Sequence, residues 1–214
     1  MKILAVSDVV VDAVYGSHTR ERFNDIDVVI SCGDLPYSYL ESIVSMLNVP
    51  CFYVRGNHDH PEYLASGRTL DKPRGWLDLD KRTAETGGLL LAGLEGSIRY
   101  RPGAPYQYTE RQIARKVRSM VPALLANRLR HGRYVDVMVT HSPPRGIHDG
   151  EDSAHRGFES LLSFIERFEP RYLLHGHKHV YGPERTRTRC AGTEVVNVYP
   201  VTVIELSDVV LTDV

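Results

Sequence analysis

Short apolar runs alternate with amphipathic segments along most of the chain. Runs typical of buried strands lie at 2–7, 28–32, 51–54, 134–140 and 172–174. Apolar residues spaced three and four apart form one face of each segment that we predict as a helix, at 36–47 and 153–168. Strands that alternate with helices in this way are typical of an α/β fold.

The middle and the end of the chain have a different pattern. Residues 60–108 are rich in Gly, Pro and Tyr and contain strand-like runs at 76–79 and 89–92. Residues 194–206 alternate between apolar and polar positions like antiparallel strands around Pro200. We therefore expect further strands in both regions.

One helix has a recognisable start. Thr109 and Gln112 have the spacing of a capping box, in which each side chain bonds the other residue's backbone. The apolar positions that follow predict a helix running towards Met120. Pro122 lacks a backbone N–H, so we expect it to kink or end this helix.

Size and charge narrow the possible functions. The 214 residues are 42% hydrophobic and 25% charged, which fits one globular domain over 1–214. The formal net charge is −1, so no overall field attracts nucleic acid or an anionic membrane. Long nucleic acid is therefore not expected as the main partner.

Other features indicate a cytoplasmic protein. The apolar start is interrupted by Asp8 and Asp12 and lacks a basic segment and a cleavage site, so we expect no signal peptide. No apolar run approaches the roughly 18 residues of a membrane span. Cys32, Cys51 and Cys190 are odd in number and lack metal-type spacing, which predicts reduced thiols.

Five predicted strands end on side chains that can bind a metal, namely Asp8, Asp34, Asn57, His141 and the pair His177 and His179. The carboxyl ends of strands form the sites of open α/β sheets. A set of carboxylates, an amide and imidazoles without thiolate suits Mn, Fe, Zn or Ni. Glycines before three of these positions, Gly33, Gly56 and Gly176, allow sharp turns close to a metal.

Each of these features also has an ordinary structural explanation. A single Asp after a strand usually caps a helix or a turn, and Asn57 can occupy a left-handed turn. His141 alone could be a buried histidine with satisfied hydrogen bonds. Three histidines within residues 175–179 are harder to explain in this way. Their shared position at strand ends is the stronger argument for a metal site.

The ordered motifs resemble the signature of calcineurin-like metallophosphoesterases. They are Asp8, Gly33-Asp34, Gly56-Asn57-His58-Asp59, His141 and Gly176-His177-Lys178-His179, which together span nearly the whole chain. The resemblance implies a four-layer α/β/β/α sandwich with two facing mixed sheets. It also implies a hydrolase that holds two divalent metal ions, with Mn²⁺ expected and Fe, Zn or Ni as alternatives.

The resemblance also implies individual roles. Asp34 would bridge the two metals, Asn57, His141 and His177 would complete one site, and Asp8 and His179 would serve the other. His58 would contact the scissile phosphate, and Asp59 would orient the His58 ring. A metal-bridging hydroxide would attack a phosphodiester or another small phosphoester. No Ser or Cys is placed as a nucleophile, so we expect no covalent intermediate.

The first motif departs from this pattern. The family has Asp-x-His, whereas this chain has Asp8-Val9-Val10. Since Val10 cannot bind a metal, we expect a weak second site, with His18 or Asp12 as unsupported substitutes. A catalytically weakened scaffold protein, like the phosphoesterase-like subunit of the retromer, is the alternative function.

Two further segments are candidates for the wall of a phosphate pocket. Residues 142–157 start one position after His141 and run into the helix predicted from Ser153, whose N-terminus would favour anions. The simpler interpretation is that Asp152 and Ser153 only cap that helix. Residues 96–100 are a weaker candidate, based on their position in the irregular middle.

Overall fold

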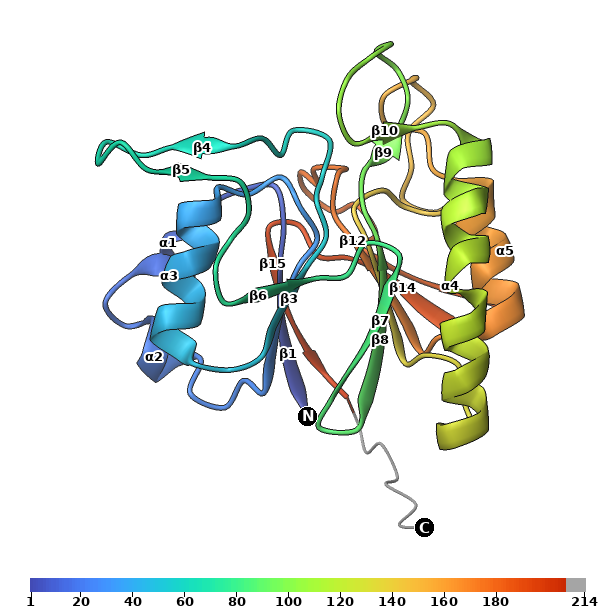
Figure 1. Ribbon diagram of the computed structural model, residues 1–214, viewed down its shortest axis with the longest axis horizontal. Helices are drawn as coiled ribbons and strands as arrows, with labels where there is room; N and C mark the ends of the chain where they lie inside the picture. Colours follow the sequence, from blue (N-terminus) through green and yellow to red (C-terminus); the bar gives the residue numbers. More distant parts are fainter. Residues whose placement is uncertain (207–214) are drawn as a thin grey trace.

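Two large mixed sheets pack face to face in the computed structural model, which describes residues 1–206 (Figure 1). The first sheet has the order β15 (Val201–Glu205), β1 (Lys2–Val6), β2 (Val28–Ser31), β3 (Cys51–Tyr53) and β6 (Trp76–Asp78). Its strands β1, β2, β3 and β6 are parallel, and β15 pairs antiparallel with β1. The carboxyl ends of β1, β2 and β3 therefore meet at one edge.

The second sheet is built on the same plan. Its order is β13 (Arg187–Cys190), β14 (Thr193–Asn197), β12 (Tyr172–His175), β11 (Val137–Thr140), β8 (Leu89–Leu94) and β7 (Arg82–Thr86). The four inner strands are parallel, and both edge strands run antiparallel to their neighbours. Two short ribbons pair β9 (Ser97–Ile98) with β10 (Gln107–Tyr108) and β4 (Glu62–Tyr63) with β5 (Thr69–Leu70).

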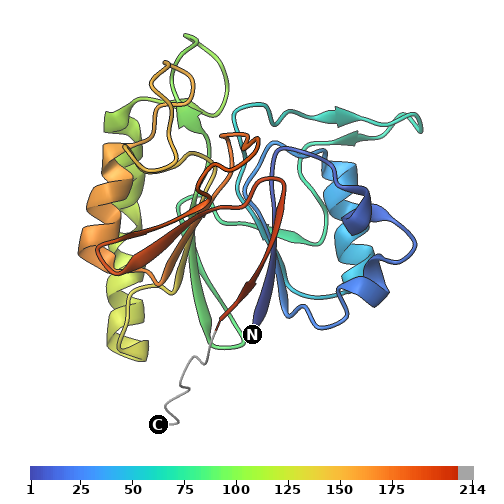
Figure 2. The same ribbon diagram turned by 180° about the vertical axis from the view of Figure 1, so that it is seen from behind.

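Helices cover the outer face of each sheet (Figures 1 and 2). The first sheet carries α1 (Asp12–Tyr15), α2 (Thr19–Arg22) and α3 (Tyr37–Leu47), and the second carries α4 (Glu110–His131) and α5 (Glu159–Phe168). This arrangement confirms the predicted α/β/β/α sandwich. No helix within residues 1–206 has the length and apolar character needed to cross a membrane.

Strand alternation produces the layers. In β1, Ile3 and Ala5 belong to the core between the sheets, whereas Leu4 and Val6 pack under the helices of the first sheet. Successive side chains of a strand point to opposite faces, so strands covered on both faces are apolar throughout. This explains why the strand runs of the sequence are continuous rather than alternating.

Of the two outcomes predicted for Pro122, the end of the helix was wrong, whereas the capping box of Thr109 and Gln112 is confirmed. Helix α4 continues through Pro122 to His131. Pro122 is exposed, so the backbone hydrogen bond that it removes lies where water can replace it. Met120 and Leu124 on either side are buried, and this packing holds the helix together.

The predicted start of the last helix was also wrong. Helix α5 begins at Glu159 rather than Ser153. Glu110 of α4 caps it, because its carboxylate accepts hydrogen bonds from the backbone N–H groups of Glu159 and Ser160 at 3.1 and 2.7 Å. The Glu110 carboxylate thus occupies the N-terminus of α5, where we had expected a phosphate to be favoured.

The C-terminal strands do not lie in one sheet. β14 joins the second sheet beside β12, and β15 crosses to the first sheet beside β1. The three cysteines, Cys32, Cys51 and Cys190, are free thiols as expected.

Candidate metal centre

Three of the candidate ligands leave their strands through left-handed turns. Asp8 follows β1, Asp34 follows β2 and His177 follows β12, with φ angles of 64°, 58° and 67°. Residues with a Cβ adopt this conformation only where the surrounding structure enforces it, commonly at functional sites. A Cβ on Gly56 would collide with the Asp34 carboxylate, and one on Gly176 with that of Asp8. The glycines therefore allow these carboxylates to approach the neighbouring turns.

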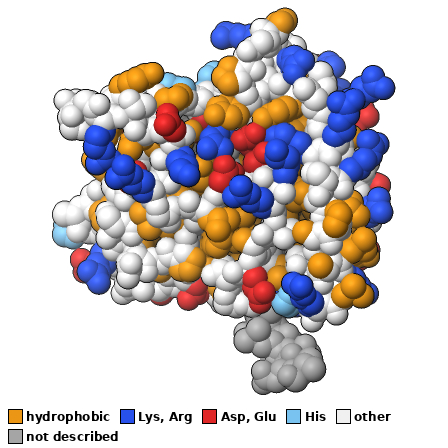
Figure 3. All heavy atoms as spheres, in the orientation of Figure 1, with side chains coloured by type: hydrophobic (Ala, Val, Ile, Leu, Met, Phe, Trp, Pro, Cys, Tyr) orange, Lys and Arg blue, Asp and Glu red, His pale blue; other side chains and the backbone are white. Residues whose placement is uncertain are grey.

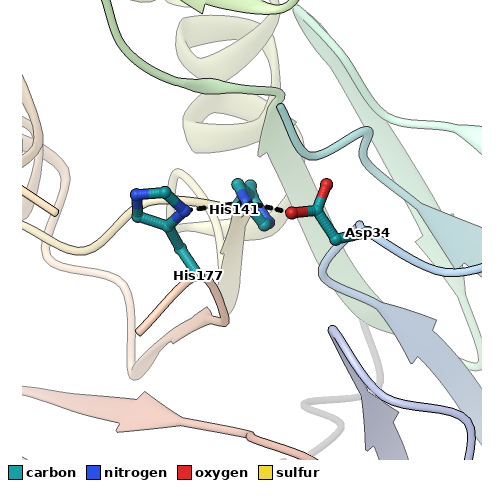
Figure 4. Close-up of side chains that lie close together, drawn as sticks. All are labelled: Asp34, His141 and His177. Carbon is teal, nitrogen blue, oxygen red and sulfur yellow. Dashed lines mark hydrogen bonds and ion pairs between the residues drawn. The ribbon is translucent and has the colours of Figure 1, made fainter. Parts of the chain in front are cut away.

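Side chains from three other strand ends converge on His141, and two of them, Asp34 and His177, are drawn with it in Figure 4. Its Nε2 atom lies 3.0 Å from Oδ1 of Asn57, 3.1 Å from Nδ1 of His177 and 3.3 Å from Oδ2 of Asp34. Ligand atoms of Asp34, His141 and His177 all lie within 4.8 Å of one another. The two sheets thus bring one carboxylate, one amide and two imidazoles to a single point.

The other nitrogen of each imidazole fixes the position of its proton. Nδ1 of His141 lies 2.7 Å from the carbonyl oxygen of Cys32, and Nε2 of His177 lies 2.8 Å from that of Ala154. A carbonyl only accepts, so both nitrogens carry hydrogen. Lone pairs on Nδ1 of His177, Oδ1 of Asn57 and Oδ2 of Asp34 therefore all lie next to Nε2 of His141. One proton there cannot serve all three acceptors fully, whereas a divalent cation between them would bind every donor atom.

Burial and charge shift the pKa values of this cluster in different directions. Burial acts to lower the pKa of His141, but the carboxylate of Asp34 outweighs it and raises the value to about 9. Burial, together with the charge on His141, lowers the pKa of His177 to about 3. Burial opposes ionisation of Asp34, yet the charge of His141 holds its pKa at about 2. The metal-free cluster thus retains one proton, which a cation would displace.

Asp8 and His179 form a looser pair beside this cluster. Nε2 of His179 lies 3.8 Å from Oδ1 of Asp8, whose side chain is 2% exposed, whereas that of His179 is 43% exposed. Oδ2 of Asp8 accepts a hydrogen bond from the backbone N–H of His177 at 3.1 Å. The pair is thereby tied to the first cluster but remains open to solvent on the histidine side.

Asp59 makes contacts in the structure that the sequence did not predict. Its buried Oδ2 atom accepts hydrogen bonds from the backbone N–H groups of Asp34 and Gly56 at 2.8 and 2.6 Å. Among the described residues it has no hydrogen bond to the ring of His58, so the orientation of that ring by Asp59 stays a prediction. Burial and the charge of Asp34 raise the pKa of Asp59 to about 6. Asp59 thus joins the turns after β2 and β3.

His58 is exposed at the edge of the cluster. Its backbone N–H donates to Oδ1 of Asp34 at 2.8 Å, which places the residue beside the candidate bridging carboxylate. Its side chain lines the same cavity as Asp34 and His177. This position is compatible with contact to a phosphate held in the cavity.

Neither of the two suggested side chains, His18 and Asp12, takes the place left by Val10. Val10 itself is 43% exposed and does not line the cavity. His18 lies at the surface 3.4 Å from Glu21, and Asp12 begins α1. Neither of them lines the cavity in the described part of the chain, so the suggestion that they substitute for the missing ligand finds no support.

The candidate ligands other than His141 border a cavity of about 750 Å³. Both segments expected at its wall reach it, through Tyr100 on one side and through Gly150, Asp152, Ala154 and His155 on the other. Asp152 does not cap α5 but accepts hydrogen bonds from the backbone N–H groups of Ala154 and His155. A local turn, not a helix end, therefore forms this wall.

Three other residues of the wall were not expected from the sequence. They are Arg101, Lys178 and Tyr181. Lys178 and Tyr181 flank the candidate ligand His179 in sequence, and Arg101 follows the candidate segment at Tyr100. Their closeness in sequence to His179 and Tyr100 was the signal that could have identified them.

Comparison with known proteins agrees with the architecture. A family model described as calcineurin-like phosphoesterase matches residues 1–181. An uncharacterized protein of Methanocaldococcus jannaschii is 26% identical over 214 residues, covering 94% of this chain and 88% of that protein. The crystal structure of TT1561 of Thermus thermophilus superposes with a TM-score of 0.63 at 17% identity, over 92% of this chain and 88% of the other. That likeness shows the fold.

A crystal structure of Vps29 from Entamoeba histolytica is more distant. It has a TM-score of 0.46 and 12% identity, over 97% of this chain and 87% of that one. This value is too low to support an argument about function. The match over residues 1–181 carries the assignment: the chain belongs to the calcineurin-like phosphoesterase family of metal-dependent phosphoester hydrolases.

Proposed function

We propose that this protein hydrolyses small phosphodiesters with the help of two divalent metal ions, with Mn²⁺ as the expected metal. The convergence of lone pairs from Asn57, His177 and Asp34 on Nε2 of His141 carries the proposal. The donors are nitrogen and oxygen atoms, a set that suits Mn, Fe, Zn or Ni.

The two sites would differ in strength. Asp34, Asn57, His141 and His177 would hold the first ion, and their contacts support a tight site. Asp8, Asp34 and His179 would hold the second, where Val10 supplies no ligand. Bound divalent ions supply Lewis acidity and lower the pKa of bound water, so that direct attack on phosphorus needs no protein nucleophile.

The chain's own residues would position the substrate and move a proton. His58 is exposed in the cavity, where its imidazole can donate a proton to the leaving oxygen or bind a phosphoryl oxygen. Asp59 keeps the turns that carry Asp34 and Asn57 in place through its two backbone hydrogen bonds. The backbone carbonyls at Cys32 and Ala154 hold the two imidazoles so that their free nitrogens face the donor set.

The proposed partner is a small molecule. On the face shown in Figure 3, Lys and Arg side chains are interspersed with acidic and hydrophobic ones rather than gathered into one basic region. The net charge of −1 also gives little attraction for long nucleic acid. We further propose that the protein acts in the cytoplasm as a single domain.

Val10 favours a second candidate function, a binding protein with weakened catalysis. One experiment separates the two. Purified protein is dialysed, analysed for metal, supplied with Mn²⁺ and assayed on methyl p-nitrophenyl phosphate with and without chelator. We expect bound metal and chelator-sensitive turnover. Metal binding without turnover on a broad panel of phosphoesters would favour the binding protein, and failure to take up any metal would overturn both metal sites.

A further inference from the structure

The cavity is larger than a phosphoryl group requires. Its volume of about 750 Å³ falls in the range of pockets that enclose a drug-sized molecule. The turns after β1, β2 and β3 form only part of its wall, and the remainder comes from the loops after β9, β11 and β12. The part of the substrate beyond the phosphoryl group can therefore be recognised by these loops.

Tyr181 presents an aromatic ring in this part of the cavity. Its side chain is 71% exposed, although two neighbours hold it in place. Its hydroxyl lies 3.1 Å from Nδ1 of His179, and its ring meets that of Tyr199 edge-on at 6.1 Å and 70°. Tyr199 in turn stacks on His179 at 4.5 Å and 17°. An exposed aromatic ring that is fixed at its hydroxyl and at its edge is prepared to stack on a flat ligand.

A second aromatic residue and a cation belong to another part of the wall. The hydroxyl of Tyr100 accepts a hydrogen bond from Nδ2 of Asn57 at 3.2 Å, and the guanidinium of Arg101 lies 5.6 Å from the Tyr100 ring centre. Lys178 is paired with Glu184 at 3.4 Å. Arg101, by contrast, has no carboxylate within ion-pair distance among residues 1–206. An exposed cation that is not neutralised by a carboxylate, at a proposed phosphoester site, is suited to bind an anionic oxygen.

We propose that the substrate is a nucleotide whose base stacks on Tyr181 while Arg101 attracts its phosphoryl charge. The inference rests on the proposed function, because it takes the metal centre as the binding place of the phosphoryl group. Every base offers a flat π-face, and stacking on a protein aromatic contributes measurably to binding with little dependence on base identity. The arrangement therefore favours nucleotides in general and discriminates little among their bases.

The test compares adenosine 5′-monophosphate with ribose 5-phosphate, which lacks the base. Calorimetry measures the binding of each to the full-length protein in the presence of Mn²⁺. We expect the nucleotide to bind about tenfold more tightly, because a tenfold difference lies within the range that stacking of one base on an aromatic ring contributes. Tyr181→Ala should reduce the ratio of the two affinities to about one.

Three further variants separate stacking from other effects. Tyr181→Phe keeps the ring and should keep the ratio, although it loses the hydroxyl contact to His179. Arg101→Gln should weaken both ligands in parallel, because it removes a charge that attracts the phosphoryl group of either. Tyr63→Ala removes an exposed tyrosine of β4, outside the cavity, and should leave both affinities unchanged.

The outcomes are decisive in either direction. Equal binding of the two ligands to the wild-type protein, or a nucleotide preference that survives Tyr181→Ala, would overturn the inference. The Tyr181 variants can also alter metal binding through the contact to His179. Such a change affects the affinities for both ligands equally, so it does not alter their ratio. If the ratio behaves as expected but no phosphoester is hydrolysed, the nucleotide site stands and the proposed hydrolase fails.

Discussion

Nε2 of His141 lies 3.1 Å from Nδ1 of His177, although 36 positions separate the two residues in sequence. The carbonyl groups of Cys32 and Ala154 fix the proton on the opposite nitrogen of each ring. Two ring nitrogens held this close, with a carboxylate and an amide oxygen beside them, are stable only with a proton or a cation between them. Backbone carbonyls thus orient both rings in the way that the proposed cation site requires.

The two metal sites should differ in affinity. We expect His177→Ala to lower the affinity of the tighter metal by at least about tenfold, since loss of a supporting contact alone typically costs 10–100-fold. His179→Ala should leave this metal in place and remove the weaker one. Titration with Mn²⁺ after chelator treatment measures both. Retention of the tighter metal by His177→Ala would contradict the assignment.

A histidine at position 10 should strengthen the weaker site. Val10 supplies no donor, and an imidazole two residues after Asp8 offers a ligand suited to these metals. We expect Val10→His to tighten the weaker metal by at least about tenfold. Val9→His is the matched control, because Val9 is similarly exposed at 37%. Equal effects of the two changes, or no effect of either, would show that the gap at position 10 is not a missing ligand.

His58 should affect turnover without affecting metal binding. We expect His58→Ala to lower kcat by about 10²-fold, the lower range for loss of a general acid, while metal content stays constant. His60→Ala removes a nearby exposed histidine whose Nδ1 lies 2.8 Å from the carbonyl oxygen of His58. It should change kcat by no more than about twofold, since it leaves the proton donor intact. Turnover on an aryl phosphodiester and elemental analysis of both variants check this.

The stability of the metal-free protein should fall as pH decreases below about 6.5, the ordinary pKa of histidine. Burial lowers the pKa of His175 to about 3, and burial also lowers the pKa of its partner His148, 3.0 Å away. The unfolded chain therefore binds these protons first, which favours unfolding by about 1.4 kcal/mol per pH unit for each fully shifted group.

Urea denaturation between pH 7.5 and 5 measures this slope. His175→Gln removes the largest of these shifts while keeping a polar side chain, so its slope should be smaller by about 1 kcal/mol per pH unit. Its stability at pH 7.5 should be lower because the hydrogen bond to His148 is altered. An unchanged slope would show that His175 does not remain neutral in the folded protein.

The cap that α4 provides for α5 should contribute to stability. Glu110→Ala removes the acceptor for two backbone N–H groups at the start of α5, so we expect a loss of about 1–2 kcal/mol. Glu166→Ala changes an exposed glutamate later in α5 and should cost less than about 0.5 kcal/mol. Thermal or urea denaturation of the two variants compares them. A similar loss in both would exclude a specific cap.

The sequence by itself determined the strands that carry the candidate ligands, the three longer helices apart from some of their ends, and the set of candidate ligands. Buried strands require apolar side chains on both faces, and the turns after them require Gly33 and Gly56. Short stretches of sequence therefore specify these features without information from distant residues. The capping box at Thr109 and Gln112 is local for the same reason. The family motif added the four-layer arrangement, which periodicity does not specify.

The tertiary structure alone decided which distant groups satisfy one another. Pro122 remains helical because buried neighbours hold α4 against the second sheet, and Glu110 caps a helix 49 positions away. Asp59 bonds the backbone of two turns, and Tyr181 and Arg101 reach one cavity from loops of different strands. Such contacts depend on how the layers pack, and the free energy of packing and burial outweighs local preference at each of these positions.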